Sequence, residues 1–208
     1  MARIFLLSPA QSGGPRARIL LAPGADFPLA RAVRGPDGAP LGEVFSFLSG
    51  LYFRGKLTYA RRFAQPPSGL PGIVVITPSE GLLGPDARVD AARLKAFADV
   101  PIEADEPRYL EPLRRDIGLI VDRAPRHTEF VLLGSIASAK YVDPLLSAFG
   151  PRLLFPPDFV GRGDMSRGGL LLRAASAGVE LDYRPIDGAS RNGPRAVKLA
   201  ELARRPHA

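Results

Sequence analysis

Two carboxylates lie in loops where an acid or a base could act on a bound ligand. Glu80 follows the apolar run of residues 72–76, and Asp164 lies in the glycine-rich segment 155–169, just before a predicted helix. A carboxylate in such a position can assist the attack of water on a glycosidic or ester bond. The structural alternatives are a solvated turn residue for Glu80 and a helix N-cap for Asp164. We take both as candidate catalytic groups.

Cations, hydroxyls and glycines occupy the same kind of loop. Small residues let main-chain N–H groups approach a phosphate, a cation adds charge, and a neighbouring aromatic ring can stack on a base. Residues 49–56 hold two glycines, two aromatic rings and two cations, and residues 155–169 are comparably dense. The residues predicted to contact a ligand or its phosphate are Ser12, Gly13, Gly14, Arg16, Ser49, Tyr52, Arg54, Lys56, Ser135, Lys140, Asp158, Arg162, Ser166 and Arg167.

These segments also have interpretations without a ligand. Residues 12–16 (SGGPR) match neither the dinucleotide-binding pattern nor the P-loop, so a plain turn fits them as well. Tyr52 would pack in the core with its neighbouring cations solvated, and Ser135 or Ser138 would cap a helix. In residues 155–169, an N-cap role explains Asp164. It does not explain four glycines among two arginines, which suggest backbone that comes close to another group.

Four of the polar loops each follow a short apolar run that predicts a buried strand. The runs are residues 3–7, 72–76, 130–133 and 152–155. In an open parallel sheet the loops that follow the strands gather at one edge, and ligands bind there. We therefore expect one composite anion site. The residues that should share its rim include Lys56, Glu80, Lys140 and Arg162.

Strands that alternate with helical segments predict an α/β fold, with a mainly parallel central sheet of about four to five strands and flanking helices in three layers. The expected helices cover residues 15–35 in pieces, 41–48, 51–65, 90–99, 107–123, 138–149 and 165–177, and a last strand or extended edge covers 180–186. Pro112 must then lie in the first turn of its helix or break it. Residues 1–186 form a single domain in this interpretation, followed by a basic C-terminal extension, residues 187–208, with a short helix over 195–205.

Composition excludes several kinds of chemistry. The absence of cysteine removes disulfides, thiol nucleophiles and thiolate-bound metals. Two histidines, His127 in a polar turn and His207 beside the end of the chain, cannot form a site with several histidine ligands and are poorly placed for a Ser-His-Asp triad. No signal peptide or membrane-spanning run is visible, so we expect a cytoplasmic protein that does not bind membranes. No cofactor is indicated, and a magnesium dependence stays open.

The charge balance favours an anionic partner. The formal net charge is +7, which raises the odds of nucleic acid, nucleotide or phosphate binding. Only four of the 28 basic residues are lysines, and alanine, glycine and proline are abundant, as is typical of GC-rich coding. That bias explains the choice of arginine over lysine but not the positive surplus. The oligomeric state cannot be predicted.

Three short patches resemble the YaaA-type peroxide-stress proteins and small uncharacterised bacterial relatives. They are residues 6–11 (LLSPAQ), 48–52 (LSGLY) and 81–86 (GLLGPD). Gln11 stands where that family has lysine, Phe53 stands where it has glycine, and the second and third patches are separated rather than continuous. The resemblance implies an α/β fold and an association with DNA, and it supplies no catalytic residues.

Three functions remain open at this point. The first is a nucleic-acid- or nucleotide-binding protein with a composite anion site, which could hydrolyse a glycosidic or ester bond. The second is a non-catalytic DNA- or RNA-binding accessory protein of a stress response. The third is an enzyme that acts on a small phosphorylated or carboxylated substrate. Whether the chain is an enzyme at all is left undecided by its residues.

Overall fold

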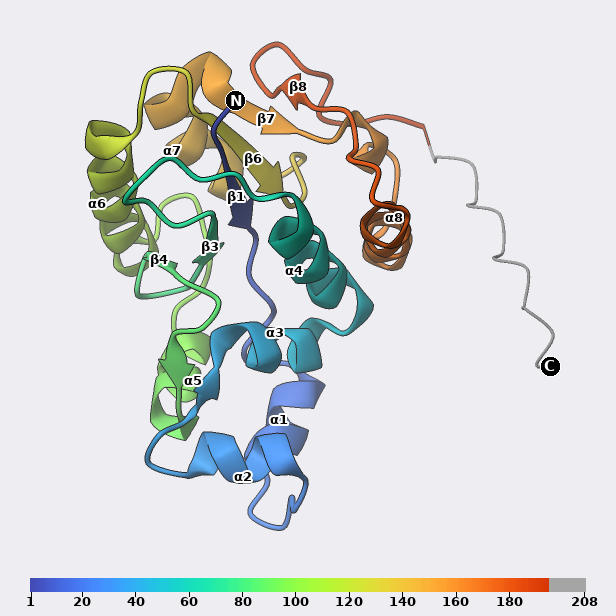
Figure 1. The fold of residues 1–208 in the computed structure, drawn as a ribbon. Helices are drawn as coiled ribbons and strands as arrows, with labels where there is room; N and C mark the ends of the chain where they lie inside the picture. Colours follow the sequence, from blue (N-terminus) through green and yellow to red (C-terminus); the bar gives the residue numbers. More distant parts are fainter. Residues whose placement is uncertain (195–208) are drawn as a thin grey trace, which may run out of the picture.

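A six-stranded sheet forms the centre of the protein in the computed structural model, which describes residues 1–194 (Figure 1). Its strand order is β4-β3-β1-β6-β7-β8. The central strand β1 (Arg3–Leu7) pairs in parallel with β3 (Ile73–Ile76) and β6 (Glu129–Leu133), and β6 pairs in parallel with β7 (Leu153–Phe155). The edges are the short antiparallel strands β4 (Leu82–Leu83) and β8 (Arg184–Pro185). The predicted α/β class with a mainly parallel sheet is confirmed.

The sheet has six strands rather than four or five because the two edge strands are too short to produce a sequence pattern. Each has two residues. Residues 82–83 were expected to be loop, and the expected edge over 180–186 contains only the two residues of β8 as strand. A periodicity of two cannot be recognised over so short a length, and the pairing partner alone decides the conformation.

The apolar strands form because both faces of the sheet are buried. Phe5, Leu7 and Val75 point into one hydrophobic cluster, whereas Ile4 and Leu6 point into the other. Alternate residues of a strand face opposite sides, so continuous runs of Ile, Val, Leu and Phe suit a sheet covered twice. The three layers that were predicted therefore follow from the uninterrupted apolar character of β1, β3 and β6.

Different helices cover the two faces. Helices α4 (Leu51–Phe63) and α8 (Asp164–Ala177) pack on one face, and α6 (Pro107–Arg123) and α7 (Ala139–Phe149) pack on the other. Figure 1 shows the remaining helices grouped beyond the carboxyl end of β1. They are α1 (Pro15–Leu21), α2 (Pro28–Arg34), α3 (Leu41–Ser49) and α5 (Ala91–Ala98). The two-residue strands β2 (Ala39–Pro40) and β5 (Arg88–Val89) pair beside them, and single 3₁₀ turns occupy Gly150–Arg152 and Pro157–Phe159.

Two glycines allow α4 and α8 to lie in direct backbone contact. A Cβ atom on Gly168 would lie 2.7 Å from the carbonyl oxygen of Leu51, and one on Gly55 would lie 2.7 Å from the carbonyl oxygen of Gly168. Neither position has room for a side chain. The glycine within the predicted helix 51–65, which costs about 1 kcal/mol in helix propensity, is therefore explained by packing.

Pro112 lies inside α6, neither in its first turn nor at a break, so that expectation was wrong. The proline removes one hydrogen bond of the helix. The helix continues because Tyr109, Leu113 and Ile117 form one buried face against the sheet. Packing of this apolar face outweighs the local defect.

The chain beyond residue 186 is described only in part. Residues 187–194 stay close to the domain, with Arg191 paired to Asp143 at 3.3 Å and the Ala189 N–H donating to the Ile186 carbonyl. The predicted helix over 195–205 lies outside the described residues. Within residues 1–194, none of the helices combines the length and the apolar character needed to cross a membrane.

Candidate functional site

A cavity of about 660 Å³ lies at the carboxyl edge of the sheet. The loops after β1, β3 and β6 contribute to its wall, as do the starts of α7 and α8, the end of α5 and the junction of α3 with α4. Its volume is within the range of sites for small molecules and cofactors. The lining residues are Ser8, Pro9, Ala10, Gln11, Ser12, Gly13, Leu48, Ser49, Tyr52, Pro78, Phe97, Ala98, Val100, Pro101, Ile102, Glu103, Ser135, Lys140, Tyr141 and Asp164.

Nine of the sixteen candidate residues do not line this cavity. Those on its wall are Ser12, Gly13, Ser49, Tyr52, Ser135, Lys140 and Asp164. Those elsewhere are Gly14, Arg16, Arg54, Lys56, Glu80, Asp158, Arg162, Ser166 and Arg167. The structure therefore brings together the loops after β1, β3 and β6 and the start of α8, but only some of their candidate side chains.

Glu80 is held away from the cavity by an ion pair. Its carboxylate accepts from Arg93, with Nε 2.7 Å from Oε1 and Nη2 on the second oxygen. The turn that carries Glu80 is closed by Thr77, whose hydroxyl accepts from the Glu80 N–H and donates to the Gly81 carbonyl. The hydrogen bonds with Glu80 raise the pKa of the Arg93 guanidinium. Glu80 thus connects the loop after β3 to α5. This structural role differs from the catalytic role that was expected for it.

Two more cations lie outside the cavity. The Arg16 guanidinium donates to the Phe47 carbonyl at 3.0 Å, and Arg54 is exposed on α4. Both side chains were expected to contact phosphate. Arg16 instead joins α1 to α3.

The arginines of residues 155–169 mainly bind their own segment. Arg162 Nε donates to the Asp158 carbonyl at 2.8 Å, and Arg167 Nε donates to the Phe159 carbonyl at 3.1 Å. Arg162 Nη1 also lies 3.4 Å from the Ser166 hydroxyl. Both arginines line a separate, smaller cavity of about 200 Å³. The glycines of this segment were expected to approach a ligand, but Gly168 instead approaches α4.

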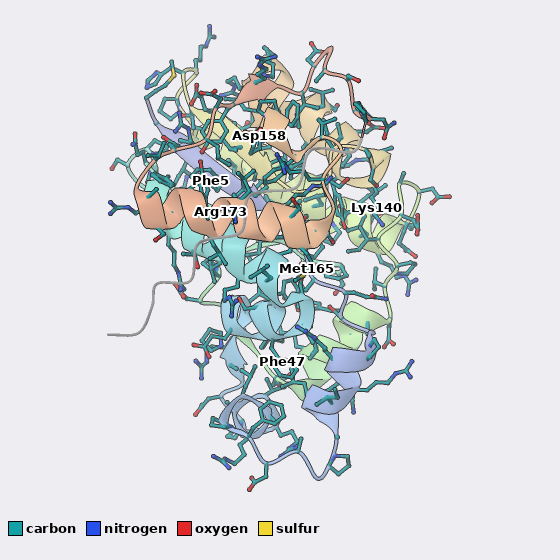
Figure 2. The ribbon with its side chains drawn as sticks, turned by 90° about the vertical axis from the view of Figure 1, so that its right-hand side faces the viewer. Phe5, Phe47, Lys140, Asp158, Met165 and Arg173 are labelled. Carbon is teal, nitrogen blue, oxygen red and sulfur yellow. The ribbon has the colours of Figure 1, made fainter. Side chains whose placement is uncertain are left out.

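Asp164 lines the main cavity as the first residue of α8. The N-cap of α8 is Gly163, so the alternative that makes Asp164 the cap was wrong. Its carboxylate lies 3.4 Å from Arg167 and its side chain is 70% exposed. Figure 2 shows Lys140 beyond the end of α8 that carries Met165, the residue after Asp164. A carboxylate and an amine thus face one cavity from two different helices.

Lys56 is buried behind the cavity wall. Its side chain is 1% exposed, and its Nζ lies 2.5 Å from the Ser8 carbonyl oxygen and 2.9 Å from Ser8 Oγ. The rings of Tyr52 and Phe53 lie against the same nitrogen, at 4.5 and 4.8 Å. Burial lowers the pKa of this amine to about 7, and the attraction of Asp164 only partly opposes that effect. Neither a solvated Lys56 nor direct phosphate contact describes it.

Two buried hydroxyls on the cavity wall make no hydrogen bond of standard geometry with the described residues, although the Arg167 guanidinium lies near the Tyr52 hydroxyl. They are Ser12 Oγ and Tyr52 Oη, on side chains that are 5% and 6% exposed. Burial raises the pKa of the Tyr52 phenol, so it stays a donor at neutral pH. The Tyr52 ring packs edgewise on Phe159 and beneath Lys56. The ring is therefore occupied, and the hydroxyl is the part of Tyr52 for which the described residues supply no hydrogen bond.

Further donors surround these hydroxyls. Within residues 1–194 no hydrogen bond uses the main-chain N–H groups of Gln11, Ser12 and Gly13, and Lys140 makes no ion pair. Its amine lies 5.6 Å from the Tyr141 ring, and burial raises the pKa of the Tyr141 phenol to about 12. The wall also carries the exposed carboxylate of Glu103. The cavity is therefore rich in donors and mixed in charge.

The main residue that the sequence interpretation missed is Ser8. It stands directly after the central strand β1 and before a proline. The available signal for its partner was a lone lysine in an otherwise apolar helix face. The wall segment from Phe97 to Glu103 gave no comparable signal, because it follows a helix rather than a strand. No three His, Asp or Glu side chains in residues 1–194 come together in an arrangement that could hold a metal ion.

Comparisons of the chain with protein-family models, with curated proteins and with solved structures find no match. A function therefore has to be argued from the cavity itself.

Proposed function

We propose that this is a cytoplasmic protein that binds a nucleotide in the 660 Å³ cavity, either free or as one unit of a nucleic acid. The observation that supports it best is the pair of buried, unpartnered hydroxyls of Ser12 and Tyr52 on the cavity wall. A buried polar group without a partner costs about 1–3 kcal/mol. A ligand with hydrogen-bond acceptors recovers that cost, and phosphate oxygens are strong acceptors.

The other parts of the wall match the remaining parts of a nucleotide. Lys140 adds a charge for the phosphate, and the free N–H groups of residues 11–13 add neutral donors. Phe97, Val100 and Ile102 offer apolar surface to a base. The carboxylates of Glu103 and Asp164 can accept from ribose hydroxyls. These two carboxylates would repel a ligand that carried only negative charge.

A nucleic acid is the second form in which the nucleotide can arrive. The net charge of +7 and the resemblance of three patches to the YaaA-type proteins support it. A cavity of this size accommodates one unit, so an end or an extruded nucleotide would enter rather than a duplex. Carboxylate-assisted hydrolysis remains a prediction for Asp164, the one of the two candidate acids that lines the cavity.

Titration with a 5′-mononucleotide and with a short single-stranded oligonucleotide tests this proposal. Lys140→Ala should raise the Kd by about tenfold, since a hydrogen bond to a charged group contributes about 1.5–3 kcal/mol. Lys95→Ala, an exposed lysine on α5 outside the cavity wall, is the matched control and should leave the Kd unchanged. Absence of binding, or equal weakening in both variants, would contradict the proposal.

The salt dependence separates the two forms of nucleotide. Oligonucleotide affinity should fall steeply between 50 and 200 mM salt if several phosphates are neutralised. Mononucleotide affinity should fall much less, because one phosphate is involved. Equal and shallow salt slopes for both would favour the free nucleotide.

A further inference from the structure

Ser8 and Lys56 form a pair in which one residue faces the cavity and the other stands behind it. Ser8 lines the cavity wall at the end of β1, and its Oγ lies 2.9 Å from the buried Nζ of Lys56. Ser8 Oγ also lies 3.4 Å from the Leu133 carbonyl of the neighbouring strand β6. A ligand in the cavity can therefore meet the hydroxyl but not the amine.

The surroundings of Lys56 suit a neutral amine. Nζ can donate one hydrogen to the Ser8 carbonyl at 2.5 Å and direct a second toward the rings of Tyr52 and Phe53. When the amine is neutral, its lone pair can accept from the Ser8 hydroxyl once that hydroxyl turns away from the Leu133 carbonyl, to which it donates over a long 3.4 Å. The charged groups that act on it are Asp164, which favours the protonated form, and Arg167, which opposes it. Among residues 1–194, no carboxylate forms a hydrogen bond or ion pair with Lys56.

We propose that Ser8 is a nucleophile and Lys56 its general base, and that the protein hydrolyses a carboxylic ester bound in the cavity. A serine hydroxyl needs an adjacent base to attack a carbonyl carbon, and an amine in hydrogen-bond contact serves as such a base. The lowered pKa of Lys56, about 7, is consistent with an amine that accepts a proton at neutral pH. This activity goes beyond nucleotide binding and does not depend on it.

The proposed reaction has two steps. Ser8 Oγ bonds to the ester carbonyl carbon while its proton moves to Lys56 Nζ, and the tetrahedral intermediate then expels the alcohol, which takes that proton. Water next attacks the acyl-serine. Its proton moves to Lys56, the carbon–Oγ bond breaks, and Ser8 recovers the proton as the carboxylic acid leaves. No oxidant, metal or further reactant enters.

The donors on the wall favour an acyl substrate over a phosphoryl one. A tetrahedral acyl intermediate develops a single oxyanion, which neutral donors stabilise. Ser12 Oγ, Tyr52 Oη and the free N–H groups of residues 11–13 are donors of that kind on the same wall. Transfer of a phosphoryl group spreads charge over three oxygens and calls for several cations. The wall offers Lys140 alone, beside two carboxylates.

Labelling of the full chain with a fluorophosphonate probe, followed by peptide mass mapping, tests the nucleophile. One adduct is expected, on Ser8, and Ser8→Ala should abolish it. Ser176→Ala, an exposed serine of α8, should label like the wild type. Lys56→Met should slow labelling on the order of 100-fold, as loss of a general base does. An adduct that forms elsewhere, or that forms on Ser8 at the same rate in Lys56→Met, would overturn the proposal.

The unsubstituted protein supplies a test that does not depend on how the variants fold. Its labelling rate should rise with pH through a midpoint near 7, the pKa of Lys56. A rate that is flat from pH 6 to 9 would overturn the assignment of the base. Hydrolysis of 4-nitrophenyl acetate should show a burst of one 4-nitrophenol per chain in wild type and none in Ser8→Ala. A labelled Ser8 without nucleotide binding would leave this proposal standing and refute only the nucleotide site.

Discussion

The β1 loop, residues 8–13, and the segment 155–169 look alike in sequence but differ in how their polar groups are satisfied. Both follow a buried strand and combine glycine with polar residues. In the longer segment, Arg162 and Arg167 donate to carbonyls of their own segment. The space beside Gly168 is occupied by the backbone of α4. In the shorter loop, Ser12 Oγ is buried without a partner and Ser8 meets a buried amine.

The difference shows that residue composition alone does not locate a binding site. The fold itself can use a cluster of cations and glycines, because main-chain carbonyls also accept hydrogen bonds from arginine. A modest loop can keep its donors available because the neighbouring elements supply no acceptor. The free donors, rather than the density of charge, distinguish the cavity. Four predicted effects test this comparison.

The largest effect is expected from the buried amine of Lys56. The pKa of Lys56 is about 7 in the folded protein and 10.5 as its ordinary value, so between these pH values the unfolded chain binds more protons. Raising the pH through this window therefore stabilises the folded state, by up to about 1.4 kcal/mol per pH unit. Below pH 7 both states are protonated and the dependence ends.

Urea unfolding at pH 6.5 to 9.5 measures this effect. The free energy of unfolding should rise more steeply with pH in the wild type than in Lys56→Met, by on the order of 3 kcal/mol over the range. The exposed Lys95→Met is the control and should follow the wild type. Parallel curves for wild type and Lys56→Met would mean that the amine keeps its charge in the folded protein.

The second effect compares two adjacent glycines of α8. An alanine at Gly168 would place Cβ 2.7 Å from the Leu51 carbonyl oxygen, whereas at Gly169 the nearest atom is the flexible end of Arg173 at 3.8 Å. Gly168→Ala should lower the free energy of unfolding by about 2 kcal/mol through overpacking. Gly169→Ala should raise it by up to about 1 kcal/mol through helix propensity. Urea unfolding of the pair decides the matter. Equal changes would show that Gly168 is not held by α4.

The fold was more predictable than the site. Strands β1, β3, β6 and β7 and the helices between them follow from apolar runs and helical spacing, because both patterns are local. The burial of Lys56 is not local: it depends on β1 meeting α4, 48 residues away in the chain. The capture of Glu80 by Arg93 depends in the same way on the placement of α5. The gathering of loops at one edge could be predicted from topology, but not which side chains would remain available.

The third effect compares two buried tyrosines of α4. Tyr59 Oη lies 2.5 Å from Tyr183 Oη and accepts from the Leu181 N–H at 2.8 Å, whereas Tyr52 Oη has no partner. Tyr59→Phe should lower the free energy of unfolding by about 1 kcal/mol. Tyr52→Phe should leave it unchanged or raise it by up to about 1 kcal/mol, because an unsatisfied hydroxyl is removed.

Ligand binding gives the opposite order for the same two variants. Tyr52→Phe should weaken mononucleotide binding, since it removes a donor from the cavity wall, whereas Tyr59→Phe should not. Thermal unfolding and calorimetric titration of the two proteins provide both readings. Destabilisation by Tyr52→Phe equal to that of Tyr59→Phe would show that the Tyr52 hydroxyl is already satisfied in the ligand-free protein.

The smallest effect is expected at Glu80, a candidate catalytic acid that is bound in an ion pair with Arg93. The Glu80–Arg93 pair is about one-third exposed on both sides, so water and salt screen it. Glu80→Gln should lower the free energy of unfolding by about 0.5 kcal/mol, and the loss should shrink in 1 M NaCl. Asp164→Asn, which changes a cavity carboxylate exposed to 70%, should change stability less but nucleotide binding more. If Glu80→Gln abolished ester hydrolysis or nucleotide binding while the unfolding curve stayed the same, Glu80 would belong to the site after all. The division between groups used by the fold and groups left to a ligand would then fail at this residue.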